Sequence, residues 1–395
     1  HRSRRERDTA EIERCDFSDA LLTLAAWGER DALAFPWLTP PPVDSIAAAQ
    51  KLLLRIDAID GSGSITATGR QMLTLPLHPR LSRFMVEAAK LGIEDAAAMA
   101  AAMLTERDPF RGDGQRHRQT AATHFGCDIS DRVDQMRAFS RGDDSAVQNV
   151  FAAKQVQRVA AQIRRLVQNR SAGTSSAPET KDDDDSIKLK RALLAAYPDR
   201  VARRRNPGGD RGVMVGGRGV RLDRRSNARS GDLFLCIDVD SKGTEANVRS
   251  ASVIEQDWLD SHLIREVDEP FFNPSLKAVV ARRRRYFDDL LLSESPIQCL
   301  PSEAVAKLLL RHARLNVSSL LSEKSREIQS FIDRVRFVTT QMPELELPLL
   351  DEEAIEEVLE TLCQTRTSIS ELQAAPWLDH LRGRYDYPQI QLIEK

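Results

Sequence analysis

The chain has 395 residues, a length that suggests roughly two to four domains. Its 41% hydrophobic and 29% charged residues are ordinary for globular protein, and its longest strongly apolar run, residues 96–104, is far shorter than the roughly 20 residues that a membrane span needs. The five cysteines are widely spaced without a Cys-x-x-Cys pair, which argues against a disulfide framework or a zinc site. Since no signal-peptide pattern is present either, we expect a cytoplasmic protein.

The net charge of −2 hides an asymmetry along the chain. Residues 186–285 carry 21 basic and 13 acidic side chains, whereas residues 286–395 carry 11 and 19. The excess is concentrated in residues 188–229, which hold 13 basic and 3 acidic side chains. A basic segment in an otherwise balanced chain is typical of a module that faces a polyanion, although a solvated basic face is the commoner explanation of a charge run.

The N-terminal elements predict a winged helix. Residues 1–16 are charged and show no apolar periodicity. Two helical patterns follow, separated by the stiff Pro40-Pro41-Pro42. The Gly/Ser turn at residues 60–64 then leads to a short strand and to a helix that Pro76 ends. Helix, helix, turn, strand and helix, in that order, predict a winged helix over residues 17–78.

Helical spacing resumes at Pro79 and predicts a helical, ratchet-like bundle over residues 79–170. Residues 171–187 combine Ser, Gly and Pro with four consecutive aspartates, a composition that buries no core. We therefore expect a flexible acidic linker there.

The apolar period then changes from that of a helix to that of a strand. Residues 233–240, 248–254 and 277–286 are strand-like, and Gly-rich turns divide them. They predict a small, basic, OB-like β-barrel within residues 188–290. Helical patterns return after Ser302, so residues 291–395 are predicted to be mostly helical. The expected fold class is thus multidomain α+β: a winged helix, a helical bundle, a barrel and a helical C-terminal region.

No motif for catalysis is present. The sequence contains no Gly-x-x-x-x-Gly-Lys-Ser/Thr loop, Asp-Glu-Ala-His box, His-Glu-x-x-His pair or Gly-x-Ser-x-Gly elbow. We therefore predict no catalytic, cofactor-binding or metal-binding residues in this chain, which leaves binding chemistry.

Arginines near Gly-rich turns are the candidate nucleic-acid contacts, because they can reach phosphates while backbone amides approach closely. Few aromatic residues accompany them, which favours contact with the phosphate backbone over base stacking. For any single arginine of the barrel an internal ion pair is an equally good explanation, and the run at residues 282–285 is better explained as strand-edge charge. For His78 and Arg80, local hydrogen bonding and helix capping are a better explanation than contact with nucleic acid. The candidates are Arg203, Arg204, Arg205, Arg211, Arg218, Arg221, Arg282 and Arg284.

Three stretches resemble HrpB-type DEAH-box ATP-dependent helicases. The first joins Ala25-Ala26-Trp27-Gly28 to Trp37-Leu38-Thr39-Pro40-Pro41-Pro42, and the second is Leu75-Pro76-Leu77-His78-Pro79-Arg80-Leu81. The third and most discriminating is Ala196-Tyr197-Pro198-Asp199-Arg200-Val201-Ala202-Arg203-Arg204-Arg205. The order of the predicted domains is similar to the C-terminal plan of that family.

The resemblance implies that ATP and Mg are bound by two RecA-like domains that precede this region and are absent from this chain. It also implies that residues 1–16 are the remnant of the second RecA-like domain and that residues 291–395 are an incomplete HrpB-specific region. In that family the bundle and barrel close over single-stranded RNA or DNA, and we expect a monomer that guides such a strand without hydrolysing ATP itself.

Two other functions stay open. A winged-helix DNA-binding regulator would need a base-reading helix, but residues 68–75 are short and apolar. A protein-interaction scaffold is favoured by the acidic, helical residues 303–360.

Overall fold

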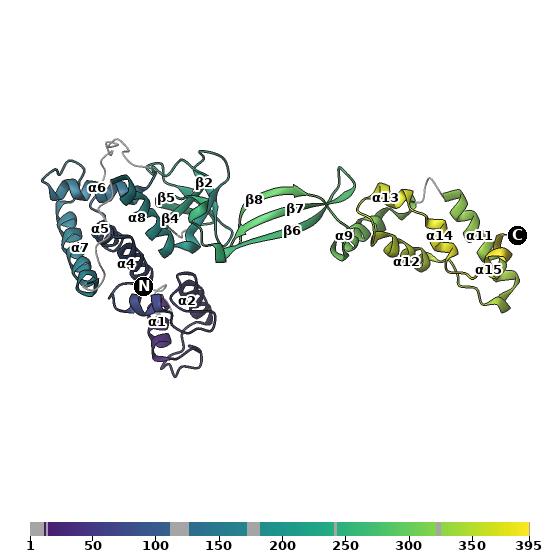
Figure 1. The fold of residues 1–395 in the computed structure, drawn as a ribbon, viewed down its shortest axis with the longest axis horizontal. Coiled ribbons are helices and arrows are strands. Elements are labelled where there is room, and N and C mark those ends of the chain that lie inside the picture. The colour runs from purple at the N-terminus through teal and green to yellow at the C-terminus, as the bar shows by residue number, and fades with distance from the viewer. Residues whose placement is uncertain are drawn as a thin grey trace, which may run out of the picture. The chain divides into compact units, whose positions relative to one another are not determined.

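The computed structural model of the protein describes residue 12 and residues 15–110, 126–171, 182–240, 243–320 and 325–394. The chain divides into two compact units: residues 1–264 with 287–290, and residues 265–286 with 291–395 (Figure 1). None of the helices in these ranges is long and apolar enough to cross a membrane. Residues 1–16, expected to be a domain remnant, lie almost entirely outside the described ranges.

Three helices and a tight turn open the first unit: α1 (Ser18–Trp27), α2 (Val43–Arg55) and α3 (Ala67–Leu73). α2 forms because its apolar residues recur at helical spacing, and Ile46, Leu52 and Leu53 are buried. The Thr66 hydroxyl accepts a hydrogen bond of 2.9 Å from the Gly69 N–H and so caps α3. A Cβ atom at Gly69 would lie 2.1 Å from the carbonyl oxygen of Ala58, so this close approach of helix and turn requires glycine.

Five helices continue the first unit: α4 (Pro79–Leu91), α5 (Glu94–Thr105), α6 (Asp128–Ser140), α7 (Val150–Ser171) and α8 (Asp182–Ala196). Buried alanines on α5 let α7 pack closely against it, and α4 packs against α8 (Figure 1). The expected linker at residues 171–187 was wrong in its C-terminal part, because α8 already begins at Asp182, and residues 172–181 lie outside the described ranges. Aspartates are favoured in the first turn of a helix by the helix dipole, so the same acidic run also suits a helix start.

A closed five-stranded barrel completes the first unit. Its strands are β1 (Val201–Arg204), β2 (Arg211–Met214), β3 (Arg218–Leu222), β4 (Leu233–Asp240) and β5 (Ala246–Val253). They follow each other round the barrel in the order β1-β2-β3-β5-β4, with β3 and β5 parallel and the other pairs antiparallel. Val220, Phe234 and Val248 fill the interior.

The pairing of β1 with β4 closes the barrel and leaves it no free edge. The strand pattern at residues 277–286, which we had predicted as part of the barrel region, therefore belongs to a separate sheet. That sheet consists of β6 (Ile264–Asn273), β7 (Ala278–Phe287) and β8 (Leu290–Ile297) in sequence order.

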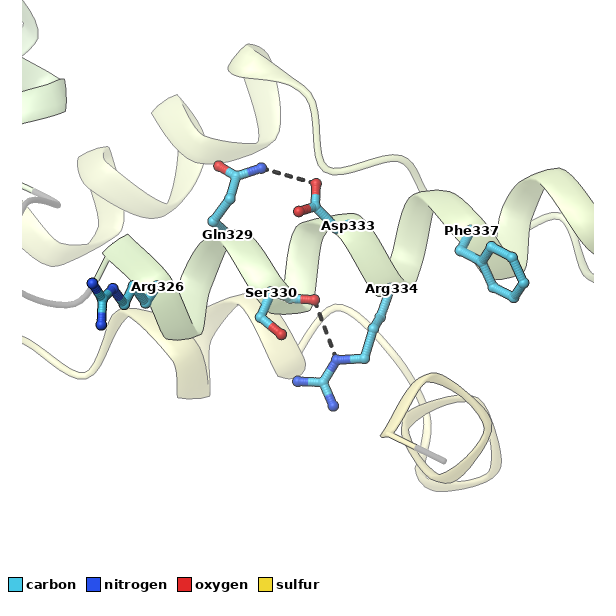
Figure 2. Close-up of a pocket in the computed structure, with 6 residues that line it drawn as sticks. All are labelled: Arg326, Gln329, Ser330, Asp333, Arg334 and Phe337. Atoms are coloured by element: carbon cyan, nitrogen blue, oxygen red, sulfur yellow. Dashed lines mark hydrogen bonds between the residues drawn. The ribbon is translucent and has the colours of Figure 1, made fainter.

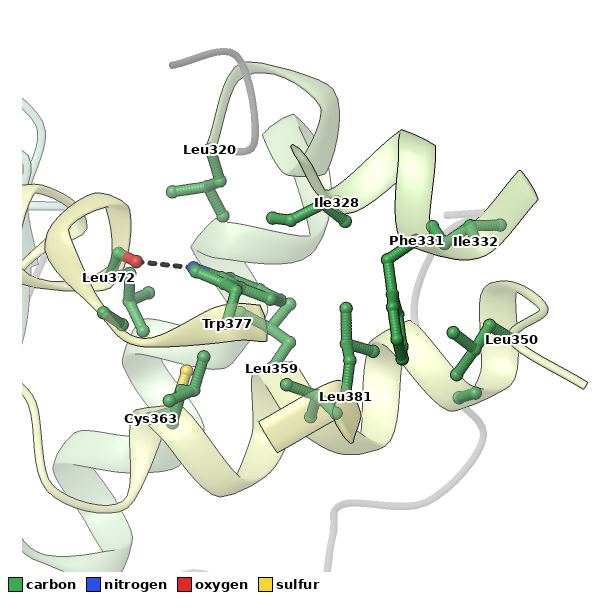
Figure 3. Close-up of a cluster of buried hydrophobic side chains, with 14 of the residues drawn as sticks. Leu320, Ile328, Phe331, Ile332, Leu350, Leu359, Cys363, Leu372, Trp377 and Leu381 are labelled. Carbon is green, nitrogen blue, oxygen red and sulfur yellow. Dashed lines mark hydrogen bonds between the residues drawn. The ribbon is translucent and has the colours of Figure 1, made fainter. Parts of the chain in front are cut away.

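The remainder of the second unit is helical: α9 (Glu303–Ala313), α10 (Val317–Leu320), α11 (Ser325–Gln341), α12 (Glu352–Cys363), α13 (Ile369–Ala374), α14 (Trp377–Arg382) and α15 (Tyr387–Glu394). Trp377, Phe331 and Leu359 lie in its core (Figure 3), and the Trp377 indole donates a hydrogen bond of 2.7 Å to the Leu372 carbonyl. The predicted fold class is confirmed.

Replacing Gly69 with alanine should lower the free energy of unfolding by about 3 kcal/mol, because the new methyl group collides with backbone that has no room to move. Urea denaturation measures the change. Gly61→Ala is the matched control, since nothing lies within 4 Å of a Cβ atom there. Equal stabilities of the two variants would contradict the close approach.

Candidate nucleic-acid interface

Arg204, in the middle of the candidate run, is buried rather than exposed. Only 6% of its surface is accessible, and its guanidinium group lies 4.9 Å from the centroid of the Phe234 ring. It donates hydrogen bonds to the carbonyls of Gly231 (2.7 Å) and Ser230 (3.3 Å), and to those of Gly209 and Ala228. These bonds tie together the loops at one end of the barrel, so Arg204 is withdrawn as a nucleic-acid contact.

Four other arginines share the outer side of the barrel. Residues opposite each other in an antiparallel ladder point to the same face, and Arg203 pairs with Val213, while Arg211 pairs with Arg221. Arg205 donates its backbone N–H to the Arg211 carbonyl (3.0 Å). Its guanidinium group lies beside Gly219. A Cβ atom added at that glycine would be 3.6 Å from a terminal nitrogen of Arg205. We call this set, Arg203, Arg205, Arg211 and Arg221, the outer arginine face.

Two acidic residues pair with arginines of the outer arginine face, and the paired arginines nevertheless stay exposed to solvent. Arg211 lies 3.7 Å from a carboxylate oxygen of Glu245, and Arg221 lies 2.9 Å from one of Asp210. The two arginine side chains remain 54% and 46% exposed. Exposed ion pairs of this kind contribute only about 0–1 kcal/mol, so a phosphate can replace the carboxylate at little cost.

Arg218 does not join the outer arginine face. It lies two residues before Val220 and four before Leu222, both of which point into the barrel, so strand alternation directs Arg218 away from the side that carries Arg221. The sequence spacing of these arginines had suggested one cluster, which the structure separates into two sides of β3.

The arginine run of β7 forms a ladder of ion pairs within its own sheet. Arg282 contacts Glu294 at 2.5 Å, and Arg284 contacts both Glu269 and Glu294. On the other face of the strand, Arg283 lies 2.8 Å from Asp268, and Arg285 lies 3.9 Å from Glu266. The candidates Arg282 and Arg284 are therefore already paired with acids from the two flanking strands.

An interaction that sequence reasoning missed joins α4 to the segment before β1. The Arg80 guanidinium group donates two hydrogen bonds of 2.7 Å to the two carboxylate oxygens of Asp199, and a third of 3.2 Å to the Ala196 carbonyl. It also lies 5.2 Å from the centroid of the Tyr197 ring, which Arg200 approaches to 5.1 Å. Two of the stretches singled out by resemblance thus meet here.

The expectation for this junction was half right. The His78 ring accepts the Arg80 backbone N–H at 3.3 Å and caps α4, which confirms the local role predicted for His78. The prediction of a local role for Arg80 was wrong, because its partner lies 119 residues away in the sequence. The two stretches share only proline and arginine residues and a resemblance to the same family, and neither feature predicts that they pair.

The ion pair shifts the titration of Asp199. Burial alone would raise the pKa of this carboxyl group, but the hydrogen bonds and charge of Arg80 outweigh burial and hold the pKa below its ordinary value. The exposed fractions of the two side chains are only 12% and 20%, so water screens the pair weakly.

A second buried carboxylate joins the bundle to the barrel. Asp128, at the start of α6, accepts hydrogen bonds from the Ser226 hydroxyl (2.7 Å), the Asn227 N–H (2.7 Å) and the Ala251 N–H (2.8 Å). Burial raises the pKa of Asp128 although these three donors oppose the shift. Its contacts hold both the loop after β3 and strand β5 against α6.

Known proteins share this arrangement of bundle and barrel. Residues 49–77 match the winged-helix part of the helicase-associated domain (HA2), and residues 78–172 match its ratchet-like part. The chain corresponds to the C-terminal portion of a DEAH-box helicase. Within the described residues of this helicase portion, no group of three or more His, Cys, Asp or Glu side chains could hold a metal ion.

Two relatives illustrate the similarity. The human probable ATP-dependent RNA helicase DHX40 is 32% identical over 212 residues, which cover 49% of this chain and 27% of that protein. The Escherichia coli ATP-dependent RNA helicase HrpB is 26% identical over 394 residues, which cover 97% of this chain and 43% of that protein. The helicase portion therefore spans less than half the length of either relative.

A solved structure shares the fold. The crystal structure of the E. coli DExH-box NTPase HrpB superposes with a TM-score of 0.54 at 22% sequence identity, covering all of this chain and 45% of that chain. A second crystal structure of E. coli HrpB superposes with a TM-score of 0.53. The winged helix, helical region and closed barrel of the helicase portion agree with this fold.

Replacing Arg80 with alanine should lower the free energy of unfolding by about 3–5 kcal/mol, because Asp199 would keep a buried charge without its partner. Arg80→Lys should recover only part of the loss, since lysine cannot donate the two parallel hydrogen bonds. Arg158→Ala, on the exposed side of α7, serves as the control and should change stability by less than about 0.5 kcal/mol. Urea denaturation distinguishes these values; an Arg80→Ala variant as stable as the control would contradict the assignment.

The lowered pKa of Asp199 predicts a pH dependence with a definite sign. The stabilisation by this carboxylate is fully present above the ordinary aspartate pKa of about 3.9 and is lost as pH falls through the lower folded value. The stability difference between the wild type and Asp199→Asn should therefore be constant near neutral pH and shrink below about pH 4. Denaturation curves between pH 3 and pH 7 measure it, and a difference that grows on acidification would refute the sign.

Proposed function

We propose that this chain guides single-stranded nucleic acid as the accessory part of an ATP-dependent helicase. The observation that carries the proposal is the outer arginine face: four arginines on one side of a closed barrel, where the side chains of Arg211 and Arg221 stay 54% and 46% exposed beside Glu245 and Asp210. A cationic face on a rigid barrel suits the evenly charged backbone of a nucleic-acid strand.

The contacts at this face are expected to be with phosphates rather than bases. The two aromatic residues near the basic segment, Tyr197 and Phe234, are both buried and present no ring for stacking. Arginines without stacking rings bind a strand largely regardless of its sequence. Sequence-tolerant binding is what a helicase needs, because it moves along whatever strand it encounters.

ATP hydrolysis is inferred to come from outside this chain. The relatives are named ATP-dependent RNA helicases, and the sequence printed here contains no phosphate-binding loop. We therefore infer that RecA-like domains bind ATP and Mg, that this chain alone hydrolyses no ATP, and that RNA is the natural strand. A monomeric, cytoplasmic protein is consistent with this function.

The rival functions find no comparable support. The helix that would read DNA, α3, has seven residues, and Gly69 and Met72 on it are buried. Arg70 and Gln71 alone are too few for a base-reading surface. The winged helix therefore serves better as packing for the bundle than as a DNA reader.

Replacing Arg205, Arg211 and Arg221 together with alanine should weaken binding of single-stranded RNA and flatten its salt dependence. Each lost phosphate contact removes about 0.7 from the slope of log K against log salt, so the slope should fall by about 2. Fluorescence anisotropy with a labelled oligouridylate over a salt series gives the slope.

Arg282→Ala with Arg284→Ala is the matched control, because these arginines are paired within their own sheet and the slope should stay unchanged. An unchanged slope in the barrel variant, or an equal change in the control, would remove the outer arginine face as the binding site.

A further inference from the structure

The outward side of α11 carries residues that the core of the second unit does not use. Its inward side buries Ile328, Phe331 and Val335. The opposite side lines a shallow cavity of about 650 Å³ (Figure 2), and the lining side chains all come from this one helix: Arg326, Gln329, Ser330, Asp333, Arg334 and Phe337. Spacings of three and four residues bring them onto one face.

Phe337 stands out on this face because 65% of its surface is exposed. An aromatic side chain placed opposite the core adds nothing to the core, yet its flat surface remains open to a ligand. One turn before it lies Arg334, whose Nε donates to the Ser330 carbonyl at 3.2 Å, while its two terminal nitrogens point away from the helix (Figure 2). The one acid of the face, Asp333, accepts a hydrogen bond of 3.0 Å from the Gln329 amide.

The charges around α11 make this face distinctive. Residues 286–395 hold 11 basic and 19 acidic side chains, and arginines elsewhere in the unit pair with glutamates of α12, as Arg314 does with Glu356 and Arg384 with Glu357. Among the described residues, neither Arg326 nor Arg334 has an acid within ion-pair distance. Among the described residues, the charges of Arg326 and Arg334 are thus left available where the exposed ring lies.

We propose that the outward face of α11 is a second binding site for single-stranded nucleic acid. Phe337 stacks on a base, and Arg334 and Arg326 contact phosphates along the helix, eight residues and thus about 12 Å apart. A single strand has flat bases, which can stack on the Phe337 ring, and negatively charged phosphates, which can bind the two arginines. The outer arginine face has no exposed ring, so the two sites recognise different parts of the strand. The proposal stands whether or not the chain serves a helicase.

Replacing Phe337 with leucine in the full chain tests the stacking contact. Leucine keeps the apolar volume and loses the ring, so affinity for a labelled oligouridylate should fall by roughly fivefold or more, as lost base stacking does. Phe337→Trp should bind as well as the wild type, and its added tryptophan fluorescence should be quenched when the strand stacks on it. Retained binding by Phe337→Trp also shows that changes at this exposed position leave the fold intact.

Two further variants distinguish base stacking with specific phosphate contacts from general electrostatic attraction. Arg334→Ala removes a proposed phosphate contact, whereas Arg336→Ala makes the same charge change on the same helix, about 200° around the helix axis from Arg334. The proposal requires a larger loss for Arg334→Ala. Equal losses, or a Phe337→Leu variant that binds like the wild type, would overturn it.

Oligouridylate and oligothymidylate distinguish RNA from DNA as the strand that binds, since the stacking contact accepts both. Quenching of the Phe337→Trp variant in excess of that of the wild type, which itself carries four tryptophans, reports on α11, so this excess should persist when the arginines of the barrel are replaced. Failure of the barrel variant to lose affinity would count against the proposed function and leave this site standing. Absence of quenching by either strand would remove this site and leave the proposed function standing.

Discussion

The ion pair between Arg80 and Asp199 is the contact on which the first unit depends. Burying two charges is costly, and a pair repays that cost only when its geometry is excellent and its other polar atoms are satisfied. Here the carboxylate takes two hydrogen bonds from one guanidinium group, which also bonds to the Ala196 carbonyl and lies over Tyr197. Because Asp199 lies immediately before β1, this contact anchors the first strand of the barrel to α4. Asp128 makes the corresponding attachment between α6 and β5, and together the two carboxylates fix the barrel against the bundle.

Whether each arginine is available for binding depends on its neighbours, and these neighbours determine the binding surface that we propose. Arg204 bonds to four carbonyls and acts as internal structure, while the arginines of β7 are matched by acids on β6 and β8. Only where arginines stand on an open surface with few acidic neighbours does the charge remain available to a polyanion. Among the described residues, Arg205, Arg211 and Arg221 meet that condition on the barrel, and Arg326 and Arg334 meet it on α11. The count of basic residues along the chain is therefore a poor guide to binding, and the local balance of charge is a better one.

Local secondary structure could be predicted from the sequence, whereas contacts between residues far apart in the sequence could not. Helical periodicity and proline positions predicted the helices, because each depends on neighbours within a few residues. Strand alternation alone would separate Arg204 from Arg203 and Arg205, so the burial of one arginine in that run could have been anticipated. The pairing of Arg80 with Asp199 and the separation of β7 from the barrel could not, because they depend on which distant elements meet. The acidic run at the start of α8 suited both a linker and a helix start, and composition does not decide between them.

Hydrogen–deuterium exchange of the chain with and without a saturating single-stranded oligouridylate measures whether a strand binds on the outside of the barrel, as we propose. We expect slower exchange in β1, β2 and β3 when the strand is bound, with little change in α3 or in β7. Protection confined to α3, with the three barrel strands unaffected, would contradict it and return the winged helix to the role of nucleic-acid reader.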